Sequence, residues 1–226
     1  MPRWQAFATA LRSDLPLERL RSELFNAGAE WESALADPSI ASFAVQVVQS
    51  FESLPDRLRA VERPETAILE AAADARRASA DTDGTSAALP LAERALVAAL
   101  MRATSGDVSL TQLSPQEAAT RFEERRGEPG QLLGAFVGEL LSQYARHVTA
   151  REMGAMSETR TSRGVDVPGM SIAESKRLAR SLAAEADTIG RRIGEAPQTA
   201  AAVRARWAAL VGDAFARGRA LPESPQ

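Results

Sequence analysis

Cysteine is absent from this sequence of 226 residues, and histidine, tyrosine and lysine occur once each. The lack of cysteine excludes disulfides, thiolate metal sites and cysteine nucleophiles, and it is typical of a cytosolic protein. Lys176 is the one lysine among 27 basic residues, and the others are arginines. Such a bias indicates the codon usage of a GC-rich bacterium, so the number of arginines alone does not predict nucleic-acid binding.

Long apolar runs are also lacking. No stretch approaches the roughly 18 residues that a membrane span needs, and the apolar start of the chain is cut by Arg12, too early for a secretory signal. We therefore predict a cytoplasmic protein without a membrane partner. Glycine-rich phosphate loops, zinc-protease helices and nucleophile elbows are missing as well, and the sequence predicts no cofactor, metal ligand or catalytic residue.

Helical periodicity is the dominant pattern that is present. Between residues 131 and 153, apolar side chains recur every four residues, at Leu132, Phe136, Leu140, Tyr144 and Val148. Further apolar residues beside this row widen it to a band, so the helix needs neighbours on more than one side. We predict that the C-terminal part of the fold packs around this helix.

Start and stop signals divide the rest of the chain into further helices. Residues 114–117 and 171–174 are capping boxes, and a proline follows Asp37 at another predicted helix start. Pro55 lies inside the helix that starts there, which favours a kink or a break over a straight helix. Residues 105–113 are the one candidate for an extended segment, and residues 154–170 are predicted to form a loop. A last helix from Pro197 carries a stripe that ends at Phe215.

The fold class predicted from these patterns is all-α, an irregular multi-helix bundle of roughly eight to ten helices. We expect an N-terminal helical portion at 1–80, a linker loop at 81–90, a C-terminal bundle at 91–220 and a disordered tail at 221–226. One continuous domain remains an alternative to this division. No internal repeat is evident, so the sequence does not indicate a solenoid.

Two groups of polar residues invite a catalytic interpretation. Tyr144 and His147 are near neighbours on the predicted central helix, with Glu139 on the same helix, but no metal ligand stands four residues from His147. We expect a structural role, with Tyr144 partly buried and its hydroxyl hydrogen-bonded. Residues 81–85, DTDGT, match a phosphatase nucleophile string, yet no buried strand precedes them and no alternation of strands and helices follows.

Basic residues collect towards the C-terminus. From 141 to 220 the sequence has 13 basic and 8 acidic residues, although the whole chain has a net charge of −3. The candidate contacts for a phosphate backbone or an acidic partner lie in the predicted loop and the helix after it: Arg160, Arg163, Lys176, Arg177, Arg180, Arg191 and Arg192. Acidic residues interrupt this face and no aromatic residue is interleaved, so a solvated helix face is the alternative.

The aromatic residues are candidates for a protein interface, because exposed aromatic clusters mark contact sites. Those we single out are Trp4, Phe7, Trp31 and Trp207. Together these patterns predict a non-enzymatic adaptor or accessory subunit of a bacterial multiprotein complex with a protein partner. The alternative is a helical small subunit of a nucleic-acid-handling complex, for example a defence system. Self-association stays open in either case.

Overall fold

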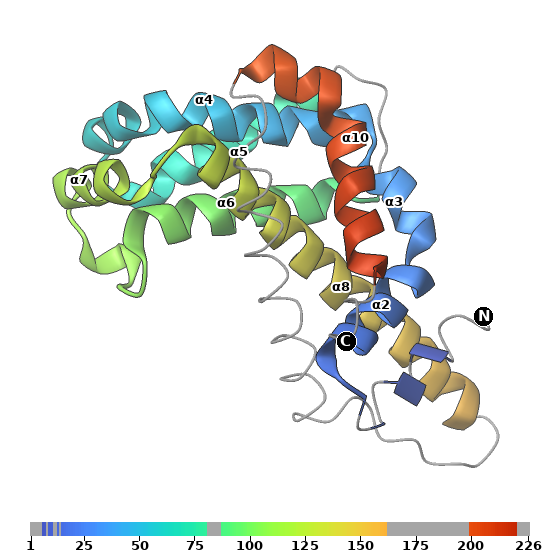
Figure 1. Ribbon diagram of the computed structural model, residues 1–226. Helices are drawn as coiled ribbons and strands as arrows, with labels where there is room; N and C mark the ends of the chain where they lie inside the picture. The colour runs from blue at the N-terminus through green and yellow to red at the C-terminus, as the bar shows by residue number, and fades with distance from the viewer. Residues whose placement is uncertain are drawn as a thin grey trace, which may run out of the picture.

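The computed structural model describes residues 15–80, 87–161 and 199–220, together with residues 6, 7, 9, 10 and 13, and these form an all-helical bundle (Figure 1). This confirms the predicted fold class. The described part contains eight α-helices and no strand. The helices are α2 (Leu17–Ala27), α3 (Ala29–Leu35), α4 (Pro38–Ala60), α5 (Pro64–Ala80), α6 (Leu89–Ser105), α7 (Pro115–Arg125), α8 (Pro129–Thr161) and α10 (Ala200–Arg219).

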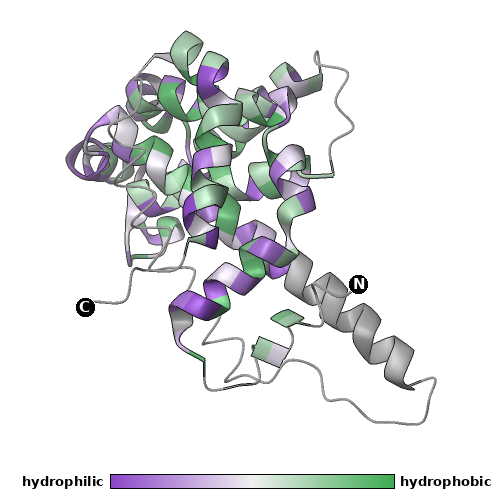
Figure 2. Cartoon of the chain, turned by 45° about the vertical axis from the view of Figure 1, so that its right-hand side comes forward, coloured by the Kyte–Doolittle hydropathy of each residue, from purple (hydrophilic) through white to green (hydrophobic). Residues whose placement is uncertain are grey.

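Helix α4 has the central place that the sequence suggested for α8. It packs against α5, α6, α7, α8 and α10 (Figure 1). Residues 39–47 of α4 are all buried, over more than two turns and on every side. Their sequence mixes apolar residues with serines and alanines, and a helix that is apolar or small all round is expected in the interior of a bundle. Figure 2 shows that several other helices carry both hydrophobic and hydrophilic residues.

Helix starts follow the side chains that the sequence offers as caps. The Asp37 carboxylate accepts a hydrogen bond of 2.8 Å from the Ser39 backbone N–H at the start of α4. Ser114 and Glu117 form the predicted capping box at the start of α7. The last helix begins later than predicted, at Ala200, because the Thr199 side chain caps it by accepting from the Ala202 N–H.

Pro55 does not divide α4, which is one helix from Pro38 to Ala60. A proline removes the N–H that would bond to the carbonyl four residues earlier, here that of Phe51. Arg126, which follows α7, supplies the missing donor: its guanidinium donates to the Phe51 carbonyl and lies 4.3 Å from the centre of the Phe51 ring. Of the two outcomes expected at Pro55, a kink or a break, the break does not occur, and this contact between distant segments satisfies the carbonyl that the proline leaves free.

Two segments differ from their predicted structure. The candidate extended segment at 105–113 holds a short 3-10 helix, η1 (Leu110–Gln112). Helix α8 continues to Thr161, through half of the predicted loop. Alanine, methionine, glutamate and arginine within residues 154–161 are good helix formers, so propensity supports the continuation. Residues 81–86, with the DTDGT string, and the tail at 221–226 lie outside the described part.

The apolar core is one continuous cluster of side chains from Phe7 to Phe215. Helix α10 packs on α2, α3 and α4, so the last described helix lies against three of the earliest ones. The stripe predicted for α10 faces this core, and its buried members are Val203, Trp207, Leu210, Val211 and Phe215. The cluster therefore joins the two portions that the sequence suggested on either side of the linker.

Candidate functional site

The single tyrosine lies where α8 meets α2, α3 and α10. Tyr144 is fully buried, and its hydroxyl donates a hydrogen bond of 2.9 Å to the Gly28 carbonyl between α2 and α3. Its ring packs against Trp31, with ring centres 5.5 Å apart, and against Phe215 at 5.6 Å. Burial raises the pKa of Tyr144, and Glu30 adds to this while Arg219 opposes it. The tyrosine therefore stays a neutral hydrogen-bond donor that joins helices.

Gly28 is fitted to this tyrosine. A Cβ built on Gly28 would lie 1.3 Å from the Tyr144 hydroxyl oxygen, so any side chain at this position would displace the ring. Gly28 has φ −92°, which other residues adopt readily. The glycine is thus required by the close approach of Tyr144 rather than by its own backbone conformation.

The other two members of the catalytic candidate group point elsewhere. His147 is exposed, with its ring edge-on to Trp31 at 5.3 Å between centres. Glu139 is buried and pairs with Arg102 of α6, whose side chain remains 65% exposed. Residues five apart on a helix differ by about 140° around its axis, so Glu139 and Tyr144 face different neighbours. The three side chains do not converge on one reacting centre.

A second polar junction holds the end of α10. Arg21 of α2 donates to the carbonyls of Gly218 and Ala220, at 3.3 and 3.0 Å, and Ser22 donates to that of Arg219 at 2.7 Å. The last carbonyls of a helix lack partners within it, and a cation near them is favourable. Arg219 also pairs with Glu32 of α3.

A hollow lies beside this junction. It measures about 390 Å³ and is open to solvent, and its lining residues are Ala6, Glu23, Asn26, Ala27, Ala29 and Arg219. The Arg219 guanidinium on its wall is already paired with Glu32. In the described part no group of three or more histidine, aspartate and glutamate side chains could hold a metal ion.

The aromatic residues proposed for an interface are placed in the core instead. Phe7 and Trp207 are almost fully buried, and Trp31 is 8% exposed. The Trp207 indole N–H donates to the Leu35 carbonyl at 2.9 Å, and its ring lies 6.1 Å from Phe136. These three rings therefore do not form the exposed cluster that the interface prediction required. Trp4 lies outside the described residues.

The basic candidates of the sequence fall beyond the described side chains. Arg160 lies in the last turn of α8, where the structure describes only the backbone, and Arg163, Lys176, Arg177, Arg180, Arg191 and Arg192 lie outside the described residues. The structure adds Arg204, Arg206 and Arg217 on α10, all exposed. A helical wheel would have found them, because the core stripe of α10 predicts which residues face outward.

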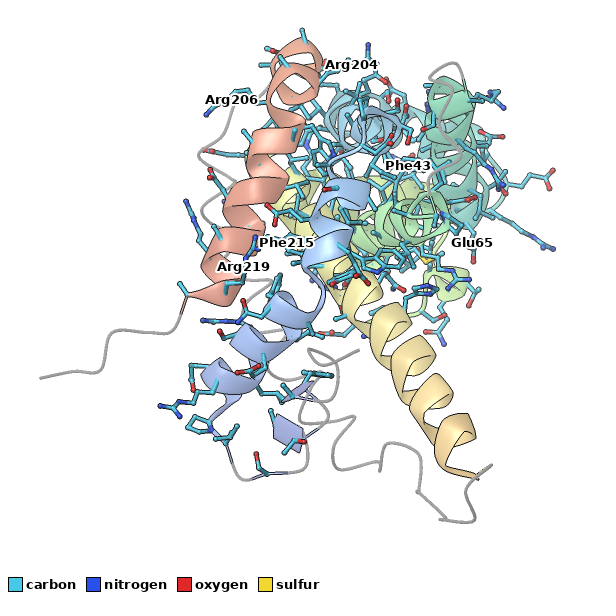
Figure 3. The ribbon with its side chains drawn as sticks, turned by 90° about the vertical axis from the view of Figure 1, so that its right-hand side faces the viewer. Phe43, Glu65, Arg204, Arg206, Phe215 and Arg219 are labelled. Atoms are coloured by element: carbon cyan, nitrogen blue, oxygen red, sulfur yellow. The ribbon has the colours of Figure 1, made fainter. Side chains whose placement is uncertain are left out.

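Ion pairs neutralise many of the other arginines. Pairs join α4 to α5, α4 to α7, α5 to α6, α6 to α8 and α3 to α10: Arg57–Asp74, Arg59–Glu123, Arg76–Glu93, Arg102–Glu139 and Arg219–Glu32. Arg204, Arg206 and Arg217 have no ion pair with any described residue, and the same holds for exposed arginines on other elements, such as Arg19, Arg63 and Arg94. Figure 3 shows Arg204 and Arg206 on opposite flanks of α10 at the end far from Arg219.

Comparison of the chain with protein-family models, with curated proteins and with solved structures gave no significant match. The helices of the described part include none with both the length and the apolar character needed to cross a membrane. The function must therefore be inferred from the residues themselves.

Proposed function

We propose that this chain is a non-enzymatic adaptor or accessory subunit of a multiprotein complex in the bacterial cytoplasm. The observation that carries the proposal is that the polar groups of Tyr144 and Glu139 form contacts between helices. The hydroxyl of the first joins α8 to the α2–α3 turn, and the carboxylate of the second joins α8 to α6. Two of the three groups that α8 offers for catalysis thus stabilise the bundle, the third, His147, lies edge-on to Trp31, and the outward helix faces are available for binding.

The proposal is tested by gentle purification of the protein from the cells that produce it, with and without nuclease. We expect a protein partner in stoichiometric amount that survives the nuclease. Size-exclusion chromatography of the chain alone would then separate a complex with a different protein from self-association. Elution of the native protein without any partner would contradict the adaptor role.

A second candidate function is supported by the basic character of the C-terminal region. The exposed arginines of α10 continue the series of basic residues between 160 and 192, so a phosphate backbone could be the partner. This function predicts that the native protein elutes with nucleic acid and a raised ratio of absorbance at 260 and 280 nm. Replacing Arg177, Arg180 and Arg191 by glutamate would then weaken binding, and the wild type would lose affinity steeply with salt. Unchanged binding by this variant would argue against it.

A further inference from the structure

The outer face of α10 differs in charge from the rest of the described surface. Its 20 residues contain four arginines and one acidic residue, Asp213. Arg219 is neutralised by Glu32, whereas Arg204, Arg206 and Arg217 are exposed and unpaired with any described residue. Three exposed arginines on this face thus stand against the single exposed carboxylate of Asp213.

The geometry of α10 places these cations along the two edges of one face. At 100° per residue, Arg206 and Arg217 share one flank, about 16 Å apart along the axis, and Arg204 lies on the other flank. The exposed residues between the flanks are Ala201, Ala205, Ala208, Ala209, Ala216 and, close to the flank of Arg206 and Arg217, Asp213. Apart from Asp213 only methyl groups lie between them, so the long arginine side chains can reach past the helix surface to a partner that lies along it.

We propose that this face of α10 binds an acidic helical segment of the partner protein, whose carboxylates pair with Arg204, Arg206 and Arg217. The inference rests on the proposed adaptor function and identifies the surface and the chemistry of the partner. Guanidinium groups bind carboxylates through two parallel hydrogen bonds, which orients a partner as well as attracting it. Charge complementarity of this kind mainly determines specificity and the rate of encounter.

A protein fits this face better than a nucleic acid does. Affinity for a phosphate backbone grows with the number of phosphates neutralised, and three arginines with an aspartate among them neutralise few. Base stacking needs exposed aromatic rings, and the one large hydrophobic side chain exposed in the described part is Leu69 of α5. The sequence pI of about 5.4 also lies far below that of typical nucleic-acid-binding domains.

The first test asks what lies against α10 in the native complex. A photoreactive phenylalanine analogue replaces Ala209 at the centre of the face, and in a control protein it replaces Ala78, an exposed alanine of α5. We expect the first protein to cross-link to a partner peptide rich in aspartate and glutamate, and the control not to. Cross-links from position 209 to nucleic acid, to a second copy of this chain, or to a peptide without acidic residues would overturn the inference.

The second test measures affinity for the cross-linked segment, made as a synthetic peptide. The triple variant Arg204→Glu, Arg206→Glu and Arg217→Glu should bind it about 100-fold more weakly than the wild type, and added salt should weaken wild-type binding. A matched control reverses three other exposed arginines that have no ion pair with a described residue, Arg19, Arg63 and Arg94, and should bind within about twofold of the wild type.

The experiments distinguish an error in the proposed α10 surface from an error in the proposed adaptor function. If the triple variant still elutes with the partner and binds the peptide like the wild type, the α10 surface is wrong and the adaptor function stands. If no protein elutes with the wild type, the adaptor function fails and the surface inference fails with it.

Discussion

Replacing Gly28 by alanine tests whether the Tyr144 contact closes the fold. The new Cβ would stand 1.3 Å from the Tyr144 hydroxyl oxygen and 2.6 Å from the ring carbon that carries it. The tyrosine must move, which breaks its hydrogen bond to the Gly28 carbonyl and disturbs its packing on Trp31 and Phe215. A buried unsatisfied polar group costs about 1–3 kcal/mol, and overpacking costs a similar amount. We expect Gly28→Ala to lower the free energy of unfolding by about 3–5 kcal/mol.

The assay is urea denaturation followed by far-UV circular dichroism, which does not depend on the tryptophan beside the mutated site. Gly212→Ala on α10 is the matched control, because a Cβ there would meet only a Glu32 carboxylate oxygen at 3.7 Å. An alanine in a helix is favoured over glycine by about 0.5–1 kcal/mol, so this variant should be slightly more stable than the wild type.

A double-mutant cycle isolates the contact itself. Tyr144→Phe removes the hydroxyl and should cost about 0.5–1.5 kcal/mol through the lost hydrogen bond, because the Gly28 carbonyl still accepts from the Trp31 backbone N–H. The phenylalanine ring also lacks the oxygen atom that clashes most severely with the Cβ introduced by Gly28→Ala. The double variant should therefore be more stable than the sum of the single effects by about 1–2 kcal/mol. Additive effects, or a Gly28→Ala variant as stable as Gly212→Ala, would refute this explanation of the glycine.

Three further predictions concern arginine contacts, each measured as a change in the free energy of unfolding. Arg126→Ala should cost about 1–3 kcal/mol, because the carbonyl freed by the proline of α4 loses its donor; no loss would contradict that role. Hydrogen bonding to Arg57, aided by nearby Arg77, holds the pKa of Asp74 below its ordinary 3.8. The resulting stability is present above pH 3.8 and is lost as pH falls through the lower pKa of the folded state, so Asp74→Asn should differ from the wild type at pH 7 and converge with it as the Asp74 carboxyl becomes protonated; a constant difference would argue against the shift. Arg102→Ala should cost about 2–4 kcal/mol by leaving the Glu139 carboxylate buried and unpaired, and adding Glu139→Gln should restore part of the loss.

Local patterns predicted those parts of the structure whose causes are local. The capping box at Ser114 and the apolar stripe of α10 involve residues within a few turns, and both are present as expected. The structural role of Tyr144 could also be predicted, because a buried hydroxyl in an apolar band must find a partner. Which carbonyl it would bond, 116 residues away, could not be predicted.

Other features depend on contacts between distant segments, and for these the local sequence pattern does not predict the structure. A proline inside a helix ordinarily breaks it, and only the arrival of Arg126 from the end of α7 satisfies the carbonyl that Pro55 leaves free. The large aromatic residues are interface candidates on sequence alone, because their presence in the sequence does not tell whether each side chain faces the core or the solvent. Three of them fill the core, whereas the outward arginines of α10 were overlooked among the many arginines of the chain.

The hydrogen bonds from Arg21 and Ser22 to the last carbonyls of α10 bear on how the chain folds during synthesis. These contacts span 197 residues or more, whereas α4 to α8 follow one another closely along the chain and pack together. Local contacts form early and distant ones late, and chains are made from the N-terminus at about 5–20 residues per second. Helix α2 leaves the ribosome well before α10, so its buried Phe25 lacks its ring contact with Phe215 for about 10–40 seconds at those rates. Helix α2 is thus synthesised early but completes its packing late, and in that interval a chaperone would compete for it.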